Sequence, residues 1–295
     1  MSLPVPQRRW RDARTLGTLD AATLTDAGPV AALAMYDLPE LAEANDRLWA
    51  AIAERLRASG IADVPAQLTR GAAPEAVWNA PGLLLAQTCG YPYMKALRGH
   101  AALVATPQYE AAGCEGPFHR SAIVVRKDQR AAALAELRGT RLALNAPSSG
   151  TGMNLLRAAV APHAHRRPFF ASVAVTGSHL ASVEAIAAGA ADVAAIDAVT
   201  WAHLETFRPA LTRDLRVLGW TDRSACLPLI TARTSSPRLR AALVEALEHA
   251  AHDPALFEAR RTLRLQGFHV LPEAHYSGVL AHEQLAADLG YPVLA

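Results

Sequence analysis

Two nearby segments share one pattern and constrain the fold more than any other feature of the chain. Residues 142–154 read LALNAPSSGTGMN, and residues 173–184 read VAVTGSHLASVE. Each is a short apolar run, then a turn rich in glycine and hydroxyl side chains, then the start of a helical pattern. This order is typical of strand–turn–helix units, in which helices connect strands of a parallel sheet. The pair therefore predicts an α/β protein.

The alternation of strand and helix patterns continues over most of the chain. Strands are predicted at residues 31–36, 67–69, 83–89, 103–106, 121–125, 192–196, 215–218 and 227–231. Helices are predicted over residues 37–59, 130–137, 198–207, 237–252, 254–264 and 276–289. Residues 1–29 show no sustained period, and we expect them to form an N-terminal arm.

Length and charge limit the classes of protein to consider. With 295 residues, 51% of them hydrophobic, the chain can bury a sizeable core and is expected to divide into two lobes. Its net charge of +2 creates no strong field, so we expect no nucleic-acid partner. No stretch approaches the ~20 apolar residues of a membrane span.

Cysteine spacing and the N-terminus bear on the cellular compartment. Cys89, Cys114 and Cys226 form no C-x-x-C pair, so buried free thiols are favoured, with a bridge between Cys89 and Cys114 as the alternative. Residues 1–14 contain basic side chains but no apolar stretch behind them, so no secretory leader is expected as written. The compartment is then the cytoplasm, or the periplasm if a leader is missing from this sequence.

The two helix starts of the opening segments suggest an anion site. The first turn of a helix leaves about four backbone N–H groups unpaired and carries partial positive charge. Two such starts facing one cleft would bind an anion without a metal or a catalytic group. The candidate residues there are Ser148, Ser149, Gly150, Thr151, Ser178 and His179. The alternative is that the serines only cap their helices and that His179 is a partly buried structural histidine.

These motifs also resemble a known family. NAPSSGTGMN at residues 145–154, VTGSH at 175–179 and ADVAAID at 191–197 resemble the phosphate/phosphonate substrate-binding proteins of ABC transporters, in the type II periplasmic binding protein superfamily. The resemblance implies two α/β lobes, each a mostly parallel sheet flanked by helices, with the ligand between them. It places lobe 1 at residues 30–122 and 221–295, and lobe 2 at residues 123–220.

The resemblance also assigns roles to single residues. Ser149, Gly150 and Thr151 match the family's hydroxyl-rich turn, although Gly150 stands where the family usually has another hydroxyl. Ser178 and His179 match its Ser-His pair at a helix start. Asp197 lies where the family helps to hold a ligand amino group, and it could equally cap the helix that follows. From lobe 1, the ends of two predicted strands supply Tyr36, Asp37, Gln87 and Tyr91, while Trp78, Asn79 and Tyr93 are weaker candidates.

Other chemistries find little support in the sequence. His163 and His165, and His249 and His252, have spacings that could bind a metal, but surface positions explain them better. The serine turn lacks the glycine of a nucleophile elbow and the lysine of a P-loop. We therefore expect no catalytic residue, no metal and no cofactor.

The sequence thus predicts a solute-binding protein for a small oxyanion: phosphonate, phosphate, sulfonate or carboxylate. Its expected partners are that anionic ligand and an ABC permease. The alternative is an enzyme of the same fold acting on a cofactor precursor of the thiamine-pyrimidine or menaquinone type, with His179 or Asp197 as acid or base. A sensor or scavenging subunit is a further possibility if the chain is cytosolic.

Overall fold

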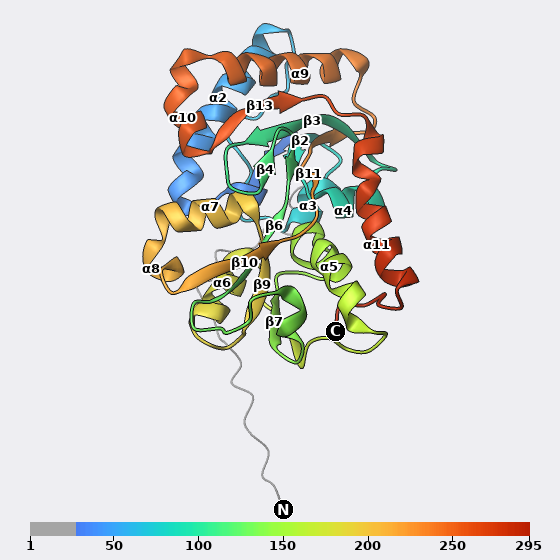
Figure 1. The fold of residues 1–295 in the computed structure, drawn as a ribbon. Helices are drawn as coiled ribbons and strands as arrows, with labels where there is room; N and C mark the ends of the chain where they lie inside the picture. Colours follow the sequence, from blue (N-terminus) through green and yellow to red (C-terminus); the bar gives the residue numbers. More distant parts are fainter. Residues whose placement is uncertain (1–27) are drawn as a thin grey trace, which may run out of the picture.

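A computed structural model describes residues 28–295, and most of the predicted arm, residues 1–27, lies outside the described residues. The described chain forms two lobes, each built on a five-stranded sheet with helices packed against it (Figure 1). The first sheet has the order β1-β2-β12-β3-β13: Val30–Ala32, Leu83–Gln87, Leu229–Ala232, Ala101–Tyr109 and Leu265–His269. The second has the order β10-β6-β9-β7-β8: Leu215–Trp220, Ser121–Arg126, Val193–Asp197, Arg141–Leu144 and Ser172–Val175. The predicted two-lobed α/β fold is confirmed.

Strand pairing within the sheets is mixed. The opening segments behave as predicted, since β7 pairs with β8 and with β9 in parallel. The expectation of mostly parallel sheets was wrong. In the second sheet β6 pairs antiparallel with both β9 and β10, and in the first sheet β12 pairs antiparallel with β2 and β3, and β13 with β3. A small third sheet lies beside the passages between the lobes, in the order β11 (Ser224–Ala225), β5 (Phe118–His119), β4 (Cys114–Glu115).

The helices follow the sequence signals closely where caps are clear. In lobe 1 they are α2 (Ala42–Ala58), α3 (Pro74–Trp78), α4 (Gly90–Pro92), α9 (Pro237–His252) and α10 (Phe257–Thr262), with a π-helical turn at Tyr93–Leu97. In lobe 2 they are the π-helical turn η5 (Gly150–Asn154), α5 (Leu155–Ala164), α6 (His179–Ala187), α7 (Ala198–Phe207) and α8 (Pro209–Thr212). The last helix is α11 (Gly278–Asp288), and 3-10 turns lie at Ala34–Tyr36, Pro39–Leu41, Leu134–Leu137, Pro254–Leu256 and Glu273–Tyr276.

Several local predictions were wrong, among them the strand at 31–36, of which only β1 at Val30–Ala32 is a strand while Ala34–Tyr36 forms a 3-10 turn. The helix at 130–137 is only the 3-10 turn Leu134–Leu137, because the Arg216 guanidinium takes the carbonyls of Gln129 and Ala131 at 2.8 and 2.6 Å. No strand forms at 67–69, where one backbone bond, from the Thr69 amide to the Ala31 carbonyl, reaches the sheet. Strand β13 was missed because it directly follows a helical pattern.

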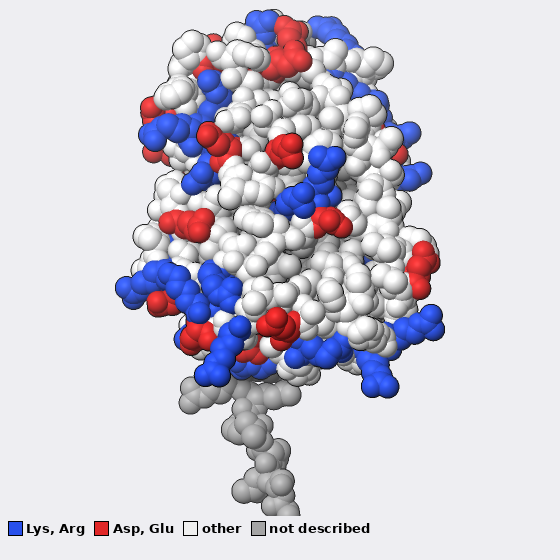
Figure 2. Space-filling view, in the orientation of Figure 1, with Lys and Arg blue, Asp and Glu red and all other residues white. Residues whose placement is uncertain are grey.

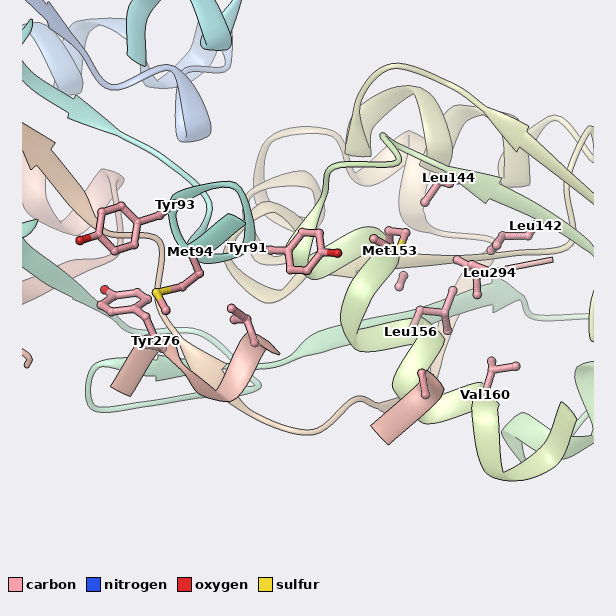
Figure 3. Close-up of a cluster of buried hydrophobic side chains, with 14 of the residues drawn as sticks. Tyr91, Tyr93, Met94, Leu142, Leu144, Met153, Leu156, Val160, Tyr276 and Leu294 are labelled. Carbon is pink, nitrogen blue, oxygen red and sulfur yellow. The ribbon is translucent and has the colours of Figure 1, made fainter. Parts of the chain in front are cut away.

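One apolar core spans both lobes. Figure 3 shows Tyr93, Met94 and Tyr276 on one side of Tyr91, and Leu142, Met153 and other second-lobe side chains on the other, all in one buried cluster. Two further clusters lie within single lobes. The lobes are therefore joined by packed side chains as well as by the chain itself.

The C-terminal segment, residues 278–295, packs against the second lobe. Helix α11 packs against α5, and the two run side by side in Figure 1. The Asn154 side-chain amide donates to the Val279 carbonyl at 2.7 Å, and Arg157 donates to the Pro292 carbonyl at 2.8 Å. The Phe169 amide donates to the Ala295 carbonyl at 2.7 Å. Residues 278–295 therefore contact the second lobe directly.

Surface and thiol features complete the description. All three cysteines are free thiols. Figure 2 shows acidic and basic side chains close to one another over the face in view. Within residues 28–295, the helices are all too short or too polar to cross a bilayer.

Candidate ligand-binding cleft

A cleft of about 470 Å³ lies between the lobes. Its wall combines the ends of strands and the starts of helices from both. The first lobe contributes Ala34, Met35, Tyr36, Asp37, Leu38, Leu41, Pro74, Glu75, Trp78, Cys89, Pro92 and Leu227. The second contributes Asn145, Ala146, Ser148, Ser149, Thr151, Gly177, Ser178, His179, Leu180, Asp197, Thr200 and His203. The cleft thus lies where the sequence predicted the ligand.

The two opening segments converge at this wall. Thr151 Oγ1 lies 3.0 Å from His179 Nε2, which joins the turn after β7 to the start of α6. Ser149 caps the first turn, since its Oγ accepts the Gly152 amide at 2.9 Å, and it also lies 3.5 Å from Thr151 Oγ1. Asn145 donates to Ser149 Oγ at 3.1 Å. Ser149 therefore caps its helix and also lies beside Thr151 at the cleft, so its capping role does not exclude a role in binding.

Gly150 does not line the cleft itself but lies against the Cys89 thiol, which does. Its amide donates to Cys89 Sγ at 3.2 Å, and a Cβ at this position would lie 2.7 Å from that sulfur. Burial raises the pKa of the Cys89 thiol, although nearby backbone amides partly offset it. Two amides of the first helix tip, those of Gly150 and Gly152, are therefore bound within the protein, and this tip offers mainly hydroxyl groups to the cleft.

The start of α6 is more open. Ser178 caps it by accepting the Ala181 amide at 3.0 Å. Within residues 28–295, the His179 and Leu180 amides have no hydrogen-bond partner. Burial lowers the pKa of His179, opposed by the Asp197 carboxylate. The second tip therefore presents free amides beside an imidazole that burial keeps in its neutral form.

Asp197 takes the capping role that the sequence allowed, and its contact with a ligand stays a prediction. Its Oδ1 caps α7 by accepting the Val199 and Thr200 amides at 2.9 and 3.1 Å, and the residue also lines the cleft. Its Oδ2 lies 3.0 Å from His119 Nδ1, and both side chains are buried. Burial alone would raise the pKa of Asp197, but His119 and the capping amides bring it to about 2.

Two buried polar side chains on the wall lack partners. Tyr36 is 6% exposed, and its hydroxyl has no hydrogen-bond partner among the described residues. His203 is 1% exposed, and both its ring nitrogens are likewise unpaired within residues 28–295. Their ring centroids are 6.4 Å apart. Sequence reasoning missed His203, although Asp197, Thr200 and His203 repeat at the spacing of one helix face.

The other first-lobe candidates are held in internal contacts. Asp37 lines the cleft, but its carboxylate is bound by Arg70 at 2.6 Å and Asn45 at 2.9 Å. Gln87 lies behind Tyr36, beside a separate cavity of about 30 Å³, and donates to the Tyr109 hydroxyl.

The aromatic candidates point in different directions. The Tyr91 hydroxyl donates to Glu283 at 3.0 Å and the Tyr93 hydroxyl to Glu273 at 2.9 Å. Trp78 lies on the wall. Gly150, Gln87 and Tyr91 are therefore not brought to the cleft wall. Within the described chain, no three His, Cys, Asp or Glu side chains gather as metal ligands would.

Comparisons with known proteins point the same way. The family model of periplasmic substrate-binding proteins of ABC phosphonate transporters matches residues 80–276. A binding-protein component of such a transporter from Pseudomonas aeruginosa has a TM-score of 0.70 at 17% identity, over 89% of this chain and 88% of that one. PhnD1 from Prochlorococcus marinus, solved with methylphosphonate, has a TM-score of 0.69 at 14% identity, over 87% and 97%. A Xanthomonas citri protein bound to chloride has a TM-score of 0.66 at 20% sequence identity, and the match covers 88% of this chain and 98% of that one. No curated protein matches this chain.

The two α/β lobes around an interlobe cleft have the fold of the type II periplasmic binding proteins. The family match covers more than half of the chain, and the chain belongs to the periplasmic phosphonate-binding proteins of ABC transporters. The members of this family bind and deliver solutes to a permease and are not enzymes, so the alternative of a cofactor-precursor enzyme has no support.

Proposed function

We propose that this protein captures a small oxyanion in the interlobe cleft and delivers it to an ABC permease. Phosphonate is the first candidate, and phosphate, sulfonate and carboxylate share the chemistry of its anionic group. The observation that carries the proposal is the 3.0 Å approach of Thr151 Oγ1 to His179 Nε2 beside the open amides of α6. Hydroxyl, imidazole and amide donors directed at one point are what an oxyanion requires.

The roles divide between the lobes. Ser148, Ser149, Thr151, Ser178 and His179 hold the anion from the second lobe. Tyr36 closes over the anion from the first lobe. Asp197 caps α7 and so fixes the position of the part of this helix that lines the cleft. Asp37 lines the cleft with its carboxylate bound by Arg70 and Asn45, while Gln87, Gly150 and Tyr91 lie behind the wall. Because Gly150 faces Cys89, the anion grip has one hydroxyl fewer than the usual family turn.

Binding is tested by calorimetry and thermal shift with methylphosphonate, phosphate, methanesulfonate and acetate. A ligand that binds only the folded state raises the melting temperature. Each donor removed from a charged group costs about 1.5–3 kcal/mol, so Thr151→Ala with His179→Ala should weaken binding by roughly a hundredfold or more. The control is His249→Ala, on the exposed side of α9. A double variant that binds as tightly as the wild type would refute this grip.

The compartment is part of the same proposal. Since the family is periplasmic, we propose that this protein works there too. Cell fractionation of the native host with an antibody to the protein is the direct measurement. Recovery in the cytoplasmic fraction alone would reject periplasmic delivery and leave the binding chemistry to be judged by calorimetry.

A further inference from the structure

His203 and Tyr36 place two unsatisfied polar groups at one part of the cleft wall. Both side chains are at least nine-tenths buried, and neither has a hydrogen-bond partner among the described residues. A buried donor or acceptor without a partner costs about 1–3 kcal/mol. A ligand group that bonds to them would recover part of that cost. Neither residue belongs to the two helix starts that hold the anion.

The charges around His203 determine which kind of group fits. Arg264 lies against α7, donating to Thr206 Oγ1 at 2.7 Å and to the Ala202 carbonyl at 3.3 Å. Burial first, and then Arg264, lower the pKa of His203 to about 4, against the pull of Asp197. The imidazole is therefore neutral at pH 7, with one donor and one acceptor nitrogen.

A second charge on the ligand would be unfavourable at this place. An ammonium group would approach the positive charge of Arg264. The Asp197 carboxylate that could compensate it already accepts two amides and contacts His119. A second anionic group would approach Asp197 itself. An uncharged hydroxyl meets neither difficulty and can both donate and accept.

We propose that His203 and Tyr36 form a second subsite, which binds an uncharged hydrogen-bonding group, such as a hydroxyl, that the ligand carries away from its anion. This inference rests on the proposed function, since the anion grip must hold the rest of the ligand. It narrows the ligand class to hydroxylated small oxyanions.

The test compares ligands that differ by one hydroxyl. The pairs are 2-hydroxyethylphosphonate with ethylphosphonate, 3-hydroxypropylphosphonate with propylphosphonate, and isethionate with ethanesulfonate, each titrated calorimetrically. A ligand hydroxyl that forms hydrogen bonds with both His203 and Tyr36 should tighten binding about tenfold in at least one pair. In His203→Leu and in Tyr36→Phe this advantage should be lost. In His203→Leu, which leaves the residues assigned to the anion unchanged, the affinity for the alkyl partner should change less than twofold. Near-UV circular dichroism verifies the fold of both variants.

Three results would overturn the subsite: equal affinity within every pair, tighter binding of 2-aminoethylphosphonate than of its hydroxyl analogue, or equal weakening of both members of a pair by His203→Leu. If no member of any pair binds the wild type but methylphosphonate, phosphate, methanesulfonate or acetate does, the subsite fails and the proposed function stands. If none of these anions binds either, the proposed function fails and the subsite fails with it. Binding of the alkyl ligands without a hydroxyl advantage rejects the subsite alone.

Discussion

At the residue scale, Gly150 and Cys89 behave as a matched pair. The thiol accepts the Gly150 amide and occupies the space into which a side chain at residue 150 would extend. This explains why a glycine stands where the family pattern has a hydroxyl. The departure reflects packing against the first lobe, and it leaves Ser149 and Thr151 free to face the cleft.

A double-mutant cycle tests this pairing. Gly150→Ala alone should destabilise the protein by about 1–3 kcal/mol, because the new methyl group overlaps the sulfur. With Cys89→Ala the 2.7 Å overlap is removed and only the 3.2 Å approach to Tyr91 Cβ remains, so Gly150→Ala should then cost clearly less. Urea denaturation of the four proteins gives the coupling energy. Strictly additive effects would show that the thiol and the glycine are independent.

His203 predicts a pH effect on stability. Its pKa falls from 6.5 to about 4 on folding, so the unfolded chain binds more protons between these values. Its contribution is fully present above pH 6.5 and is lost as the pH falls toward 4, by about 3 kcal/mol. His203→Leu should reduce the loss of unfolding free energy between pH 7 and pH 4 by about that amount. Parallel pH profiles for the two proteins would contradict the shift.

At the element scale, the second-lobe helix starts in the cleft, η5, α6 and α7, each carry a side-chain cap that also shapes the site. Ser178 caps α6 at the cleft, and Ser236 caps α9 far from it by accepting the Leu239 amide at 3.1 Å. The two serines therefore separate the structural role of a cap from a role in binding.

Replacing each serine by alanine should give the same loss of stability and different losses of affinity. Both Ser178→Ala and Ser236→Ala should cost about 1 kcal/mol of unfolding free energy, since each helix loses one capping bond. Only Ser178→Ala should weaken anion binding in calorimetry. An equal affinity for the two variants would limit Ser178 to capping.

Elements with strong local signals were predictable from the sequence. Helices α7 and α9 begin and end where capping residues and apolar spacing indicated. The helix at residues 130–137 failed because its alanine-rich pattern contains no information about Arg216, which is distant in sequence and takes its carbonyls. Local propensity predicts an element only where no distant side chain competes for its backbone.

Site residues, like helices and strands, were predictable where a local motif marked them and not where distant contacts decide their position. Thr151 and His179 carried a local motif and were found together. Gln87 and Tyr91 were chosen from strand ends alone, and tertiary contacts with Tyr109 and Glu283 hold them away from the wall. His203 lies within a helix and has no motif. Its role depends on the absence of a partner, which only the packed structure reveals.

At the scale of the whole molecule, the apolar cluster across the lobes and the C-terminal segment predict cooperative unfolding. Tyr291 and Leu294 are buried, and the Ala295 carbonyl accepts the Phe169 and Phe170 amides. Removal of residues 291–295 takes away these contacts together.

This truncation should lower the melting temperature by about 5–10 °C and separate one unfolding transition into two, measured by differential scanning calorimetry. Val293→Ala serves as the control, because Val293 is 68% exposed and its loss should change little. A truncated protein that melts like the full chain would show that the segment does not couple the lobes.

The two passages between the lobes are bonded to each other. The Ser121 amide donates to Thr221 Oγ1 at 2.9 Å, and the Thr221 amide donates to the Ser121 carbonyl at 3.0 Å. Because these two hydrogen bonds tie the connections together, we expect them to turn as one body and opening to follow a single rotation axis rather than a slide. One pair of fluorophores, one on each lobe at the mouth of the cleft, would then be enough to follow ligand capture in single molecules.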